Sequence, residues 1–216
     1  MPDAVIFDLD GVLLDSEQLW NAAKHALVTE SGGTWRAEAP EVMMGMSSPE
    51  WSAYLRDDLA VPLSQEEINA DVVRRMQDGY RDGLPLLPGA GEAVRALAAR
   101  WPLGLASSSN RELIDLFLGL AGFGDAFRVA VSSEEVARGK PAPDVYLRAA
   151  EELGVDPARA VAIEDSSNGI RAGAAAGMPV IAVPNPHYPP ADDALALAAV
   201  RVGGVAEITP ELVASL

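Results

Sequence analysis

Residues that could carry out acid–base or phosphate chemistry stand at the ends of short apolar stretches of this sequence. The first stretch, "AVIF", runs directly into "DLDG", which contains Asp8 and Asp10. A buried carboxylate costs free energy unless a cation or a hydrogen-bond donor compensates its charge. Three more sets of polar residues stand in comparable places along the chain: residues 107–110 ("SSSN"), Lys140 in "GKPAPD", and the pair Glu164 and Asp165.

Brought together, these side chains could bind a phosphate group and a divalent cation. Carboxylates gathered at one place repel one another unless a cation lies among them. A site built only from oxygen ligands suits a hard cation such as Mg²⁺. The lysine and the serine hydroxyls would add positive charge and hydrogen-bond donors for a bound anion. The residue types therefore indicate a phosphate site with Mg²⁺, if the fold brings the four sets together.

The apolar stretches are typical of the buried strands of a parallel α/β sheet. "AVIF", "PLGLA", "FRVAVS", "AVAI" and "PVIAV" alternate with amphipathic helical patterns, and the final stretch "ALAAVRVGGVAEITPELVASL" predicts one more short strand and a closing helix. Parallel order brings the carboxyl ends of the strands to one edge of the sheet, where ligands bind in such folds. The sequence thus places the four polar sets at a single edge.

Residues 16–83 predict a different unit, made of helices alone. Ser64 and Glu67 fit a capping box, and Ser48 before "PEW" fits an N-cap that is followed by proline at the first helical position. We therefore predict a core domain of residues 1–15 and 84–216 and an inserted helical cap domain of residues 16–83. The two linkers are expected near residues 14–16 and 82–86.

Composition narrows the classes of partner. The formal net charge is −16, which disfavours nucleic acid and anionic membrane surfaces. The chain has no cysteine and two histidines, His25 and His187, which excludes thiolate zinc sites and histidine-rich metal sites. The first strand begins close to Met1, and no apolar stretch approaches the roughly 18 residues of a membrane span. We expect a cytoplasmic protein, monomeric by default.

Four motifs in this order, spread over the whole chain, resemble those of a known superfamily. "DLDGVLLDSE", "LASSSN", "GKPAPDVY" and "VAIEDSSNGIRAGAAAGM" are similar to the motifs of the haloacid dehalogenase-like (HAD) superfamily. The resemblance is to its phosphatases and β-phosphoglucomutase-like phosphosugar mutases, which carry a helical cap inserted after the first motif. It implies a Rossmann-like core, a Mg²⁺ cofactor and a small phosphorylated metabolite, such as a sugar phosphate, as substrate.

The resemblance also implies roles for individual residues. Asp8 would be the nucleophile that forms an aspartyl-phosphate, and Asp10 the general acid and then the general base. Ser107, Ser108 and Lys140 would hold the phosphoryl oxygens. The chemistry itself needs such groups, because a phosphate monoester dianion repels an approaching carboxylate until positive charge neutralises it.

The metal site implied by the resemblance combines two parts of the chain. Asp165, with Glu164, would complete the Mg²⁺ site beside Asp8 and the main-chain carbonyl of Asp10. Gly11 is expected to let the backbone turn tightly toward this site.

The same motifs also allow three functions other than phosphatase activity. Asp10 disfavours haloacid dehalogenation, which in this superfamily proceeds without a metal and lacks that aspartate. A phosphosugar mutase would carry a histidine early in the first cap helix, where this sequence has Trp20, so hydrolysis is favoured over transfer. A non-catalytic phospho-ligand binder is the third reading, and the intact set of Asp8, Asp10, Lys140 and Asp165 disfavours it.

The cap is expected to set the substrate preference, because it would close over the phosphate and present its own side chains. Five residues are candidates for this role, although packing inside the cap would also explain the tryptophans and methionines: Trp20, Lys24, Met44, Met46 and Trp51. The leaving group stays open between a hexose phosphate, a polyol phosphate, phosphoglycolate and a nucleotide.

Overall fold

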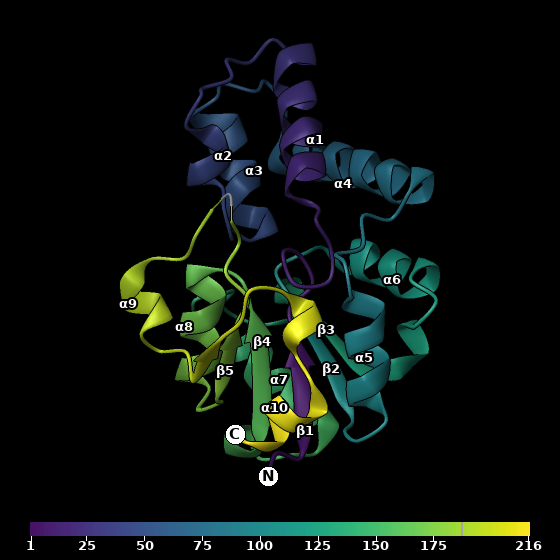
Figure 1. Ribbon diagram of the computed structural model, residues 1–216. Coiled ribbons are helices and arrows are strands. Elements are labelled where there is room, and N and C mark those ends of the chain that lie inside the picture. The colour runs from purple at the N-terminus through teal and green to yellow at the C-terminus, as the bar shows by residue number, and fades with distance from the viewer. Residues whose placement is uncertain (187) are drawn as a thin grey trace.

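The computed structural model describes residues 1–186 and 188–216, so His187 lies outside the described part of the chain. A six-stranded parallel sheet with the order β3-β2-β1-β4-β5-β6 forms its centre (Figure 1). The strands are β1 (Ala4–Phe7), β2 (Leu103–Ser107), β3 (Phe127–Ser132), β4 (Ala160–Glu164), β5 (Val180–Ala182) and β6 (Val200–Arg201). The prediction of a parallel α/β sheet is confirmed.

Helices cover both faces of the sheet, which explains why its central strands are apolar on both sides. Along β1, Val5 and Phe7 contribute to one buried cluster, and Ala4 and Ile6 contribute to the other. The first cluster includes residues of α5 (Ala90–Ala98), α6 (Arg111–Leu120) and α10 (Pro210–Ala214), and the second includes residues of α7 (Asp144–Leu153) and α8 (Ser167–Ala175). A short helix, α9 (Asp192–Leu195), precedes β6.

A group of four helices stands between β1 and β2 in the chain and beyond the carboxyl ends of the strands in space (Figure 1). They are α1 (Glu17–Glu30), α2 (Ala39–Val42), α3 (Ser48–Asp57) and α4 (Gln65–Asp82). The chain leaves the sheet and returns to it at one place, because Leu14 forms an antiparallel bridge with Leu86. Two short segments therefore join the helical group to the sheet.

Capping interactions set the starts of α3 and α4. Ser64 caps α4, and its hydroxyl accepts a hydrogen bond from the Glu67 amide, as the sequence predicts. The N-cap of α3 is Ser47, so the prediction of Ser48 was wrong by one residue. Glu50, three residues after Ser47, accepts hydrogen bonds from the Ser47 amide and hydroxyl and completes the capping box there.

The described residues form ten α-helices. None of their helices combines the length and the apolar character that crossing a membrane requires.

Candidate active site

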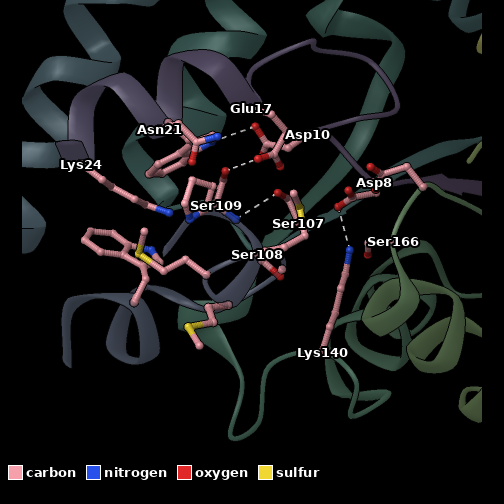
Figure 2. A pocket seen from close by; sticks show the side chains of 18 residues that line it. Asp8, Asp10, Glu17, Asn21, Lys24, Ser107, Ser108, Ser109, Lys140 and Ser166 are labelled. Carbon is pink, nitrogen blue, oxygen red and sulfur yellow. Dashed lines mark hydrogen bonds and ion pairs between the residues drawn. The ribbon is translucent and has the colours of Figure 1, made fainter. Parts of the chain in front are cut away.

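A cavity of about 70 Å³ lies between the carboxyl ends of the strands and the helical group (Figure 2). The loops after β1 and β2, the segment around Lys140 and the loop after β4 contribute its floor, and α1 and residues 40–51 contribute its roof. The lining includes every predicted site residue except Glu164, namely Asp8, Asp10, Ser107, Ser108, Lys140, Asp165, Trp20, Lys24, Met44, Met46 and Trp51. The topology thus places the polar strand ends and the predicted cap residues around one space.

Lys140 is buried between two acidic side chains. Its Nζ donates to Asp8 Oδ1 at 2.7 Å, to Glu164 Oε1 at 2.5 Å and to the Ala106 carbonyl at 3.0 Å. Burial by itself would lower the pKa of Lys140, but the attraction of Asp8 and Glu164 raises it above its usual value. Lys140 therefore carries its positive charge at neutral pH, directly against Asp8.

The carboxyl group of Asp8 is in an environment that disfavours its charge. Burial raises its pKa to about 8, with a further contribution from the negative charge of Glu164, while the charge of Lys140 acts in the opposite direction. Asp8 follows β1 directly, and its amide donates to the Ile163 carbonyl of β4 at 2.9 Å. A cation near Asp8 would favour the ionised form of this carboxyl group.

Glu164 lies behind Lys140, with none of its surface exposed. Its Oε1 accepts from the Tyr146 hydroxyl at 2.9 Å as well as from Lys140. Its Oε2 accepts from the Asp165 amide at 3.1 Å and the Ser166 hydroxyl at 3.2 Å. The carboxylate also packs on Gly169, where a Cβ would come within 1.8 Å of it. Glu164 therefore holds Lys140 in place.

The carboxyl group of Asp10 accepts hydrogen bonds from the loop after β2 and from residues at and next to the start of α1. Its Oδ2 accepts from the Ser109 hydroxyl at 2.5 Å, and its Oδ1 accepts from the Trp20 indole N–H at 3.1 Å and from the Ser16 hydroxyl. Three donors thus fix the orientation of a carboxyl group two residues after Asp8, which suits a residue that must transfer a proton at one defined place.

The serines after β2 differ in their environment. Ser107 is fully buried, and its hydroxyl accepts from the Ser109 amide at 3.0 Å. Ser108 is half-buried at the cavity wall. The sequence identified residues 107–110 as a group but did not show that Ser109 contacts Asp10. Nor did it identify Tyr146, whose place in an amphipathic helix is typical of core packing.

Three acidic groups are close enough to hold a metal ion. Oxygen atoms of Asp8, Glu164 and Asp165 lie within 4.8 Å of one another, and all three residues are buried. Burial, together with the charges of Glu164 and Asp8, raises the pKa of Asp165 well above its usual value. Within residues 1–186 and 188–216 no hydrogen-bond donor reaches the Asp165 carboxylate. A buried carboxylate without a donor beside other acids fits a site for a hard cation.

Gly11 allows the close approach of Asp165 to the first motif. Its φ is +79°, and a Cβ on it would lie 1.9 Å from Asp165 Oδ2. The position therefore requires glycine both for its backbone conformation and for space.

The five predicted cap residues form the opposite wall with Met43 and Pro40. Lys24 Nζ lies over two indole rings, 5.0 Å from the centre of Trp20 and 5.2 Å from that of Trp51. Burial lowers the pKa of Lys24 to about 8, against the attraction of Glu17 and Asp10. Glu17 also lines the cavity, and burial with the charge of Asp10 raises its pKa to about 7. Sequence reasoning did not single out Glu17.

Comparisons with known proteins agree with this geometry. The haloacid dehalogenase-like hydrolase family matches residues 2–177. Hexitol phosphatase B of Escherichia coli is 37% identical over 212 residues, which cover 95% of this chain and 94% of that protein. CbbY of Rhodobacter capsulatus is 34% identical over 203 residues, 88% of each chain. The crystal structure of CbbY from Rhodobacter sphaeroides in complex with phosphate has a TM-score of 0.86 at 28% identity, with all of both chains covered.

Proposed function

This chain belongs to the haloacid dehalogenase-like hydrolases and is a phosphatase of that family, and we propose that it hydrolyses a small phosphorylated metabolite, a sugar or polyol phosphate, with Mg²⁺. The observation that carries the proposal is one cavity in which Asp8 lies against Lys140 while Asp10 is held by Ser109 and Trp20. The relatives named as phosphatases support this substrate class. Residues 16–83 act as the cap that closes over the substrate.

Asp8 and Asp165, with Glu164 beside them, are the residues that would hold the metal ion. Their buried oxygen ligands fit Mg²⁺, and Lys140 alone leaves part of their negative charge uncompensated. Bound there, Mg²⁺ would neutralise charge on the phosphate group and thereby reduce its repulsion of Asp8.

With these residues the proposed reaction proceeds in two steps. In the first step a carboxylate oxygen of Asp8 bonds to phosphorus, the bond from phosphorus to the leaving oxygen breaks, and Asp10 gives its proton to that oxygen. In the second step Asp10 takes a proton from a water molecule, whose oxygen bonds to phosphorus. The bond from phosphorus to Asp8 breaks, and phosphate leaves. Lys140 and Ser108 orient the phosphoryl oxygens.

Trp20 supports hydrolysis rather than transfer between sugars. Its indole N–H donates to Asp10 Oδ1, where the related mutases would have a histidine side chain. An indole N–H is a donor only and exchanges no proton at neutral pH, so it can orient Asp10 but cannot serve as a second acid–base group.

Phosphate release from a panel of phosphorylated metabolites, measured with Mg²⁺ and with a chelator, tests the proposal. We expect turnover that requires Mg²⁺ and that Asp8→Asn and Asp10→Asn each abolish. Asp125→Asn is the matched control, because Asp125 is an exposed acid outside the cavity and its loss should leave turnover unchanged. Full turnover in the Asp8→Asn variant would contradict the proposed chemistry.

A further inference from the structure

The chain contains two lysines, Lys24 and Lys140, and both are buried in the wall of this one cavity. All the other basic residues are arginines or histidines. Lys140 makes three hydrogen bonds, and the proposed mechanism uses it. Lys24, with 6% of its surface exposed, makes no hydrogen bond to any described residue. An ammonium group that is buried without an acceptor is costly, and a bound ligand that accepts from it would offset this cost.

The contacts of Lys24 leave its N–H groups available to a ligand. Its ammonium group lies over the rings of Trp20 and Trp51, which attract a cation but offer it no oxygen acceptor. Figure 2 shows Lys24 extending from α1 into the cavity, on the side opposite Asp8 and Lys140. A substrate with its phosphate beside Asp8 would therefore direct its leaving group toward Lys24.

Two more polar side chains of α1 face the same space without a hydrogen bond to any described residue, Glu17 and Asn21. Together with Lys24 they stand at positions i, i+4 and i+7, which share one face of a helix. Glu17 accepts hydrogen bonds when ionised, Asn21 both donates and accepts, and Lys24 donates. A row of hydroxyl groups matches all three, because a hydroxyl group also donates and accepts.

The charges around Glu17, Asn21 and Lys24 disfavour a second anionic group on the substrate. The attraction of Glu17 and Asp10 already offsets part of the cost of burying the charge of Lys24. A carboxylate or a second phosphate on the leaving group would gain contact with Lys24 but would also approach Glu17, Asp10 and the substrate's own phosphate. An uncharged leaving group avoids this repulsion and still satisfies each donor and acceptor.

We propose that Lys24, together with Glu17 and Asn21, binds an uncharged, polyhydroxylated leaving group and selects against substrates that carry a second anionic group. The inference rests on the proposed function and adds the specificity of that site. Lys24 is a specificity-determining residue here, because it contacts the leaving group and takes no part in phosphoryl transfer.

A matched pair of substrates tests the selection. Sorbitol 6-phosphate and 6-phosphogluconate have the same carbon chain, and one end carries a hydroxyl group in the first and a carboxylate in the second. Acetyl phosphate has no hydroxyl group and serves as the short reference substrate. We expect the wild type to have a higher kcat/KM for sorbitol 6-phosphate than for 6-phosphogluconate.

The variants separate recognition from general damage to the enzyme. Lys24→Met should lower kcat/KM for sorbitol 6-phosphate by about 10- to 100-fold, as expected for a lost hydrogen bond to a charged group, and that for acetyl phosphate by less than about threefold. Glu17→Gln should narrow the preference for sorbitol 6-phosphate over 6-phosphogluconate by about tenfold. His25→Met changes an exposed neighbour on the same helix and should alter neither value.

A binding measurement on the wild-type chain tests the contact of Lys24 with the substrate without relying on the activity of a variant. Labelling the lysine side chains with ¹⁵N produces two ammonium signals, which the Lys24→Arg variant assigns. With a chelator in place of Mg²⁺, so that the substrate is not hydrolysed, inorganic phosphate should shift the Lys140 signal alone, and sorbitol 6-phosphate should shift both. The inference would be overturned if sorbitol 6-phosphate did not shift the Lys24 signal, or if the kcat/KM of Lys24→Met for sorbitol 6-phosphate relative to acetyl phosphate equalled that of the wild type. Failure of the wild type to hydrolyse acetyl phosphate would instead count against the proposed function.

Discussion

Replacing Lys140 by methionine should destabilise the protein strongly, because it removes the one cation buried between Asp8 and Glu164. The lysine side chain is 3% exposed, and those of Asp8 and Glu164 are 10% and 0% exposed. Breaking a buried ion pair from one side typically costs about 3–5 kcal/mol, since the remaining charge has no partner. We therefore expect the free energy of unfolding in the presence of a chelator to fall by about 3–5 kcal/mol at pH 7.

The loss should depend on pH in a direction that the charges determine. Without Lys140, folding brings two buried acids together without a cation, so the folded variant takes up about one proton more than the folded wild type. A folded state that binds more protons than the unfolded state loses stability as the pH rises. The difference between variant and wild type should therefore grow by about 1.4 kcal/mol per pH unit between pH 5 and 8.

Urea unfolding followed by tryptophan fluorescence measures this difference at each pH. The double variant Lys140→Met with Glu164→Gln is the control, because it also removes one of the two acidic groups that contacted Lys140 and should recover much of the loss. A Lys140→Met variant as stable as the wild type at pH 7, or a loss that is the same at pH 5 and pH 8, would refute the reasoning.

Three further predictions concern the geometry around the acids. Gly11→Ala should lower kcat/KM more than tenfold and destabilise the fold by about 1–3 kcal/mol, since φ is +79° and the new Cβ would displace the Asp165 carboxylate. Trp20→Phe should lower kcat by about tenfold with a smaller change in KM, because Asp10 loses one of its three donors. The affinity for Mg²⁺, measured by calorimetry, should rise by up to about tenfold per pH unit between pH 6 and 8, because Asp8, with a pKa of about 8, must lose its proton to bind the ion.

The two substitutions among these predictions have matched control variants. Gly122 has a φ of +70°, and no described atom would lie within 4 Å of a Cβ at this position, so Gly122→Ala should show the backbone strain without the loss of activity. Trp101 donates to the Pro2 carbonyl at 3.0 Å outside the cavity lining, so Trp101→Phe should leave kcat unchanged. Equal effects in the paired variants, or a Mg²⁺ affinity that is independent of pH, would contradict these three expectations.

The strands and the place of the polar residues could be predicted because their signals are local. Each central strand is a short apolar stretch that ends in polar residues, and parallel order then brings those ends to one edge. The helical segment after the first motif could be predicted for the same reason. Its apolar positions have helical spacing, and the segment contains no convincing strand pattern. The short helices α2 and α9 were not predicted, as the chain around them is rich in proline and glycine.

The contacts that hold the site together could not be predicted in the same way. Ser109 is one of three consecutive serines, and only the turn after β2 decides that its hydroxyl reaches Asp10. Tyr146 looks like any aromatic residue of an amphipathic helix until the fold places its hydroxyl against Glu164. Both contacts join residues far apart in the sequence, where local patterns carry no information on distance.

Detecting a phosphoryl group covalently bound to Asp8 would test the proposed reaction most directly. The enzyme with Mg²⁺ and acetyl phosphate would be quenched in acid within milliseconds, and the peptide containing Asp8 analysed by mass spectrometry, with and without borohydride reduction. We expect one added PO₃ group on that peptide and conversion of Asp8 to homoserine on reduction, with neither change in the Asp8→Asn variant. A phosphoryl group on another residue, or none during active turnover, would contradict it.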